Sequence, residues 1–118
     1  MARFLLALKP RVPAAPAALI EALAPLLNGL HAEVDHRTPA HLSALVNAGQ
    51  DPQRMQLFAD VQAAAAGSVL ELTLLSREAM GKGAPETRAV FEQMLLQAQR
   101  LPGFAVGFRS DRDGSRPR

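Results

Sequence analysis

The chain has 118 residues, the usual size of one domain, and 48% of them are hydrophobic while 20% are charged. Because it contains no cysteine, disulfides, zinc–thiolate sites and cysteine nucleophiles are excluded. A formal net charge of only +2 lacks the concentrated cations of a nucleic-acid-binding surface, and no apolar run has the length of a membrane span. These features predict a soluble, cytoplasmic, globular domain without a nucleic-acid or membrane partner.

The first part of the chain predicts a strand followed by a helix. The apolar run Arg3–Lys9 has the length of a strand, and we expect a central strand buried on both faces. Pro13 and Pro16 open the helix, and Pro25 should kink it or shorten its last turn. Its apolar stripe at helical spacing consists of Leu19, Ile20, Leu23, Leu26, Leu27 and Leu30.

A second strand is predicted over Leu30–His36, where the residues alternate, with Ala32 and Val34 pointing inward. Side chains at alternate strand positions project from one face about 6–7 Å apart, within reach of a single metal ion. On the outer face these are the three weak candidate metal ligands: His31, Glu33 and Asp35. The alternative is the polar outer face of an amphipathic strand, and no spacing here matches a known metal signature.

Two helices are predicted next, because two pairs of residues resemble a helix cap followed by proline in the first turn. Thr38-Pro39 starts a short helix that ends near Gly49, and Asp51-Pro52 starts another that ends at Gly67. Together they form a helical hairpin after the second strand.

The last part of the chain predicts a strand over Ser68–Leu75, a loop at Met80–Gly83, a helix beginning at Pro85 and a fourth strand over Phe104–Arg109. The apolar face of this helix consists of Val90, Phe91, Met94, Leu95 and Ala98.

This order of elements predicts an α+β fold, a ferredoxin-like βαββαβ sandwich with a helical hairpin between strands 2 and 3. We expect one domain over residues 1–109 and a disordered basic tail over residues 110–118. Since helices cover one face of such a sheet and the strands carry apolar residues at both parities, we expect a homo-oligomer, most simply a homodimer.

Two stretches resemble nucleoside diphosphate kinases. FLLALKP is similar to the first strand of that family, which ends in a Lys-Pro pair. LFADVQAAAAGSVLELTL is similar to a helix and strand of the family, which also has a helical hairpin between its second and third strands. The resemblance covers roughly Arg3 to Leu75, and it implies self-association and nucleotide binding.

The residue that would take up the phosphoryl group is absent. In the family this residue is a histidine in a loop after the fourth strand, since imidazole is nucleophilic near neutral pH. On that pattern RSDRDGS places Arg109 on the family's arginine and Asp113 on its histidine. All the histidines lie earlier in the chain: His31, His36 and His41. We therefore expect no catalytic residue, no cofactor and no phosphoryl transfer.

Without the catalytic histidine, the resemblance still implies weak binding of a nucleotide or another anion. It places Lys9 on a phosphate, and Arg88 and Arg109 become candidates for phosphate contacts. The base-stacking position of the family's Phe pair holds Leu57, so only Phe58 of that pair remains as a candidate contact. The predicted function is that of a non-catalytic, oligomeric domain similar to nucleoside diphosphate kinases.

Two alternatives stay open. The stretch QAQRLPGFAVGFRSDRDG is similar to the repeat of small dimeric α+β barrel proteins, including antibiotic-biosynthesis monooxygenase-like enzymes. A protein-interaction module, in which an exposed sheet face pairs with another protein or with a second copy, is the other alternative.

Overall fold

A computed structural model describes residues 2–47, 54–64, 67–79, 81 and 83–110 of the chain. Within these ranges one six-stranded antiparallel sheet is accompanied by three helices, so the predicted α+β class is confirmed. The elements follow in the order β1 (Ala2–Pro10), α1 (Pro16–Glu21), α2 (Ala24–Gly29), β2 (Ala32–Thr38), β3 (His41–Asn47), β4 (Arg54–Ala64), β5 (Gly67–Ser76), α3 (Pro85–Arg100) and β6 (Phe104–Ser110).

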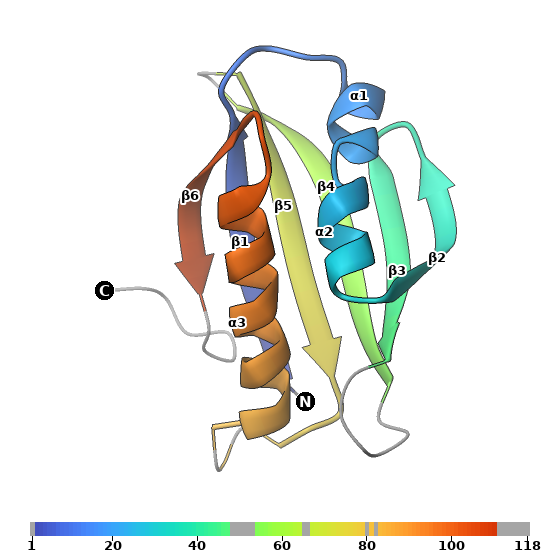
Figure 1. Cartoon of the computed structure of the whole chain (residues 1–118), viewed down its shortest axis with the longest axis vertical. Coiled ribbons are helices and arrows are strands. Elements are labelled where there is room, and N and C mark those ends of the chain that lie inside the picture. Colours follow the sequence, from blue (N-terminus) through green and yellow to red (C-terminus); the bar gives the residue numbers. More distant parts are fainter. Residues whose placement is uncertain (1, 48–53, 65–66, 80, 82, 111–118) are drawn as a thin grey trace.

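The strands lie in the order β2-β3-β4-β5-β1-β6, each antiparallel to its neighbours (Figure 1). Helix α3 connects β5 to β6, and β1 is inserted between these two parallel strands, as in a split βαβ unit. The first connection, through α1 and α2, carries the chain from β1 to the far edge of the sheet at β2.

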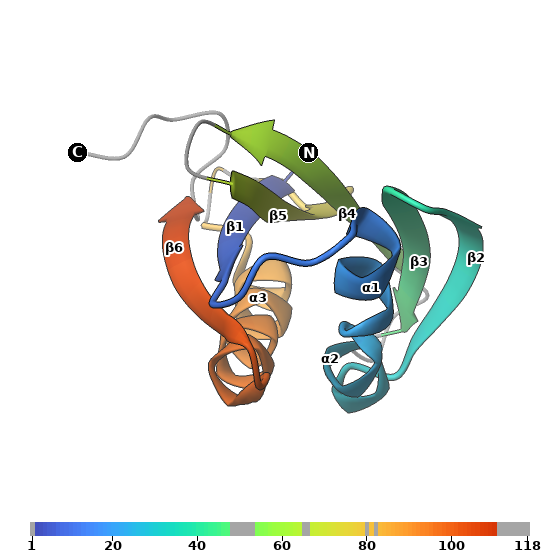
Figure 2. The ribbon, with the colours of Figure 1, turned by 90° about the horizontal axis from the view of Figure 1, so that it is seen from above.

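All three helices lie on one side of the sheet. Figure 2 shows the sheet curving around them, so that its concave face is covered. No helix of the described residues lies over the convex face, which we call the outer face. The fold therefore leaves one broad surface of the sheet uncovered.

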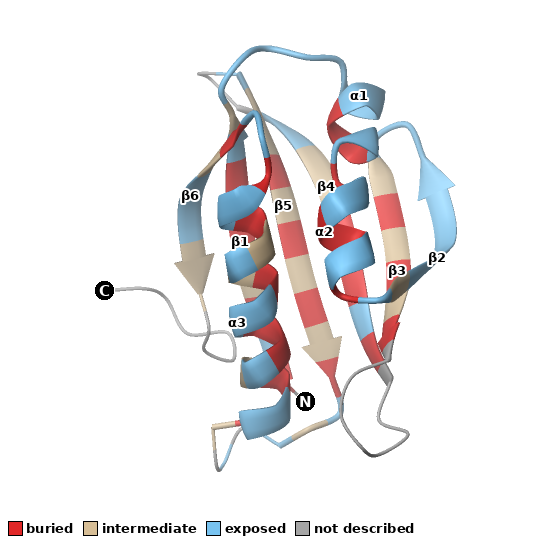
Figure 3. Ribbon diagram, viewed as in Figure 1, coloured by how far each residue is buried: buried red, intermediate tan, exposed pale blue. Residues whose placement is uncertain are grey.

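The core lies between the helices and the concave face, where alternate strand residues are buried (Figure 3). The central strands β1 and β5 contribute to this core, and Phe4, Leu6 and Leu8 face inward from β1. The other buried strand residues include Leu42, Ala44, Val46, Met55, Leu57, Ala59, Leu70, Leu72 and Leu74.

The predicted helical stripe before β2 is buried at all six positions, but the helix is broken rather than kinked. Helix α1 ends at Glu21 and α2 begins at Ala24. Pro25 explains the break, because it has no N–H for the carbonyl of Glu21 and its ring would collide with that carbonyl.

The predicted helical hairpin between strands 2 and 3 is wrong, because its residues form β3 and β4. Thr38 ends β2 and pairs with His41, so Pro39 lies in a tight turn between two strands and not in a helix. Asp51-Pro52 lies outside the described residues. The four-stranded ferredoxin-like sheet is accordingly replaced by a six-stranded one.

Apolar residues on the outer face hid this alternation in the sequence. Leu45 and Phe58 lie between inward-facing apolar residues in β3 and β4, so the apolar residues no longer alternate cleanly. β1 also differs from the expected strand buried on both faces. Its residue Leu5 is half-buried on the outer face, and Arg3 and Lys9 are exposed there.

The two edge strands, β2 and β6, differ in detail from the predicted strands. Val34 lies opposite the buried Ala44, on the inward side as expected, but in the edge strand β2 it is 45% exposed. Strand β6 extends to Ser110, one residue beyond the expected end of the domain, and the rest of the predicted tail lies outside the described residues.

Candidate functional site

The four candidate ligand-binding residues divide between the two faces of the sheet. Lys9 and Phe58 lie on the outer face, since Leu8, Leu57 and Ala59 next to them face the core. The stem of Lys9 lies along Gly107 at a bulge between β1 and β6, where an added Cβ would be 3.1 Å from its Cε and Cγ.

Arg88 and Arg109 instead lie on the helix-covered side, each over a buried ring. The Cζ atom of Arg88 is 5.3 Å from the ring centroid of Phe4, and that of Arg109 is 5.3 Å from the ring centroid of Phe91. The two rings meet edge to face with centroids 5.3 Å apart. Contacts of this kind are attractive, so both guanidinium groups help to hold α3 on the sheet.

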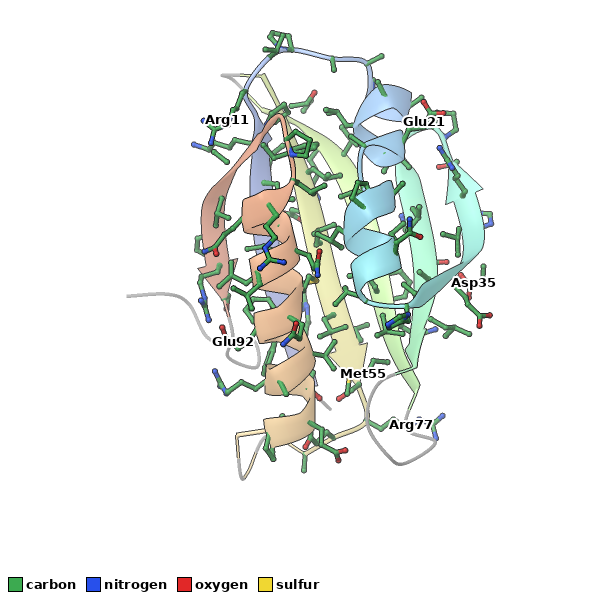
Figure 4. The ribbon with its side chains drawn as sticks, in the orientation of Figure 1. Arg11, Glu21, Asp35, Met55, Arg77 and Glu92 are labelled. Carbon is green, nitrogen blue, oxygen red and sulfur yellow. The ribbon has the colours of Figure 1, made fainter. Side chains whose placement is uncertain are left out.

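Arg109 also has a carboxylate partner. Its Nη2 donates a hydrogen bond of 3.1 Å to Oε2 of Glu92, which Figure 4 shows on the side of α3 toward β6. Because Lys9 and Phe58 lie on the opposite face from Arg88 and Arg109, the four residues do not surround one ligand.

The three candidate metal ligands are not arranged as a strand face. His31 precedes β2 and has a left-handed backbone with φ 54°. Glu33 faces Leu45 across the sheet, and Asp35 sits at a register shift, where it accepts a 2.5 Å hydrogen bond from the Ser43 hydroxyl. Among the described residues, no three His, Cys, Asp or Glu side chains are grouped to hold a metal ion.

Sequence reasoning missed a polar and aromatic cluster on the outer face. The Nδ1 atom of His41 lies 2.6 Å from Oδ1 of Asp60 on the neighbouring strand. The ring of His41 lies 6.2 Å from that of His36 and 6.2 Å from that of Phe58. Only the pairing of β2, β3 and β4 brings these residues together, and the predicted helices concealed it.

Side chains on the outer face form three rows across the strands, given by the register of the sheet. The first row contains Arg3, Leu75, Gln56, Leu45 and Glu33. The central row contains Leu5, Thr73, Phe58, Ser43 and His36. The third row contains Ala7, Glu71, Asp60, His41 and Thr38. Apolar side chains thus occur in the first two rows and at Phe108 of the edge strand β6, which pairs with Ala7 and is 40% exposed. Charged side chains occur at the sides of the face and in the third row.

A second polar cluster lies at the buried start of α3. One carboxylate oxygen of Glu78 accepts hydrogen bonds from the Thr87 hydroxyl (2.6 Å) and the Thr87 backbone N–H (2.7 Å). The other oxygen accepts one from the backbone N–H of Glu86 (3.0 Å). Glu78 thus satisfies two of the helix's free N–H groups, as a capping residue does.

The remaining hydrogen bonds of this cluster follow from its chemistry. The backbone N–H of Glu78 donates to the Ser76 hydroxyl at 3.1 Å, and the Ser76 and Thr87 hydroxyls lie 2.6 Å apart. Since the Thr87 hydroxyl donates to the carboxylate, the Ser76 hydroxyl is the donor to Thr87. Burial raises the pKa of Glu78, but its hydrogen bonds from Thr87 and Glu86 outweigh this and lower the pKa below its ordinary value.

No helix in the described part of the chain has the length and apolar character needed to cross a membrane. Comparison with models of protein families gave no match. Comparison with curated proteins also gave no match.

Among solved structures, the chain is similar to the crystal structure of protein MLL2253 from Mesorhizobium loti, with a TM-score of 0.56 and 17% sequence identity. The match covers 84% of this chain and 95% of that chain. At this level of identity the similarity concerns the fold, and the α+β architecture is therefore one that a known protein also adopts.

Proposed function

We propose that this protein is an association module that forms a homodimer through the outer face of its sheet. The proposal keeps two expectations from the sequence: a domain without a catalytic role, and self-association. The single observation that supports it most is the group of apolar side chains on a face that no described helix covers: Leu5, Leu45, Phe58 and Leu75. A sheet face of this composition is usually covered by a second layer.

The test is a charge placed among the apolar side chains of this face. We expect the wild-type chain to be a dimer at micromolar concentration in sedimentation equilibrium and light scattering. Leu75→Arg should make it monomeric, because the partner would have to bury a guanidinium group without a counterion.

Leu96 provides a matched control, because it is a leucine on α3 that is 46% exposed and far from the outer face. Leu96→Arg should leave the dimer intact. A wild-type chain that stays monomeric, or equal dissociation by the two variants, would contradict the proposal.

A further inference from the structure

We infer that the two copies pair about a two-fold axis that lies over β4 and runs along the strands. This inference rests on the proposed dimer and adds the arrangement of the two copies. It comes from the distribution of charge across the outer face.

The cations and the carboxylates of the outer face lie on different strands. Arg3 and Lys9 are both on β1, whereas Glu71 is on β5, Asp60 on β4 and Glu33 on β2. Within the described residues neither cation of β1 has an ion-pair partner, although both lie on an exposed strand position. The face is therefore basic toward one side and acidic toward the other.

This pattern selects the direction of the axis. Two identical sheets that stack face to face are related by an axis lying between them, either across the strands or along them. An axis across the strands would place each strand over the same strand of the partner. Arg3 and Lys9 would then face the cations of the partner's β1. An axis along the strands reverses the strand order and places the basic side of one copy on the acidic side of the other.

The rows then select the strand. With the axis over β4, β5 faces the partner's β3 and β1 faces the partner's β2. In the first row Leu75 meets the partner's Leu45, and Arg3 meets the partner's Glu33. In the central row Phe58 meets its own counterpart.

Arg3 and the carboxylates decide between β4 and β5 as the position of the axis. Over β4, Glu71 meets the partner's His41, and the two Asp60 side chains oppose each other on the axis, each with a histidine 2.6 Å away. Over β5, the two Glu71 side chains would oppose each other instead, and Arg3 would meet the partner's Gln56. Either position opposes one carboxylate with its own copy, but only β4 gives Arg3 a carboxylate partner, so β4 is the better position.

Cross-linking tests this arrangement, because the chain has no cysteine and a single introduced one is unique. Stacked sheets lie about 10 Å apart, which suits a short bismaleimide. Gln56→Cys lies on the axis and should cross-link to its own copy. Thr73→Cys lies on β5 and should not, but a mixture of Thr73→Cys with Ser43→Cys should give the mixed dimer.

Efficient self-cross-linking of Thr73→Cys, with none for Gln56→Cys, would move the axis to β5 and overturn the inference. Light scattering of each variant separates the proposed dimer from the proposed position of its axis. If the variants are dimers broken by Leu75→Arg but the cross-links differ from those expected, the dimer stands and this arrangement fails. If the wild-type chain is a monomer, both fail.

A charge exchange gives an independent readout. Arg3→Glu should raise the dissociation constant of the dimer about tenfold, because the symmetric dimer contains the pair of Arg3 with the partner's Glu33 twice and both copies are lost. The double variant Arg3→Glu/Glu33→Arg should restore dimerisation close to the wild-type level. An equal loss in the double variant would contradict the predicted contact between Arg3 and the partner's Glu33.

Discussion

Replacing Thr87 by valine removes one hydroxyl from the buried start of α3 while keeping the shape of the side chain. Thr87 is 0% exposed, and its hydroxyl donates to the Glu78 carboxylate and accepts from Ser76, each at 2.6 Å. A hydrogen bond to a charged group contributes about 1.5–3 kcal/mol and one between neutral groups about 0.5–1.5 kcal/mol. We expect Thr87→Val to lower the free energy of unfolding by about 3 kcal/mol.

The assay is urea unfolding at one fixed protein concentration. Since the chain has neither Trp nor Tyr, circular dichroism is the suitable signal. Ser76 is only 4% exposed, so in Thr87→Val its hydroxyl remains buried without an acceptor. The double variant Ser76→Ala/Thr87→Val removes that unpaired donor, and its loss of stability should be about 1 kcal/mol smaller than the sum of the single losses.

The pH dependence of the same variant checks the role of Glu78. Because the pKa of Glu78 in the folded chain lies below its ordinary value of 4.5, its carboxylate stabilises the fold fully above that value. This contribution is lost as the pH falls through the lowered pKa of the folded state. The difference between wild type and Thr87→Val should therefore be constant from about pH 5 to pH 7 and shrink in more acidic solution. A loss below about 1 kcal/mol, or a difference that grows in acid, would refute the reasoning.

Three further predictions concern the backbone and the candidate anion site. His31→Gly should raise the free energy of unfolding by about 1 kcal/mol in urea titrations, because φ 54° is unfavourable for a residue with a side chain. Gly103→Ala should lower it by about 1–2 kcal/mol, since the φ of Gly103 is 86°. Gly81→Ala should change it little, because Gly81 has no positive φ; an added Cβ meets open space at both positions. If an anion such as a nucleotide binds at all, its affinity in a titration should be weak, fall with salt and be further reduced in Lys9→Ala. Equal binding by the two proteins would remove Lys9 from any anion site.

Several elements were predictable because their residues carry the signal locally. The apolar stripe from Leu19 to Leu30, the helix starting at Pro85 and the strands around Ser68–Leu75 and Phe104–Arg109 lie close to the observed bounds. The helices have one apolar and one polar face, so the period of the pattern identifies them, whereas the two strands are mainly apolar runs of strand length.

The candidate binding residues were less predictable. Their assignment to one ligand required four side chains to lie close together: Lys9, Phe58, Arg88 and Arg109. The alternation of side chains along the strands and the orientation of α3 place them on two opposite faces of the sheet instead. The His41–Asp60 pair could not be found in the sequence, since its partners are 19 residues apart and meet only through the register of β3 and β4.

By itself the sequence determined the α+β class and the helical stripes, because these depend on periodicity. At Pro25 it predicted a kink or a shortened last turn, where the structure has a break between two helices. Only the tertiary structure decided that β3 and β4 are strands. Their outer residues Leu45 and Phe58 are apolar and mask the alternation, and neighbouring strands supply the hydrogen bonds that favour the extended backbone. The outer face with its rows of charge is likewise a product of strand order, because cross-strand neighbours are set by pairing and not by distance along the chain.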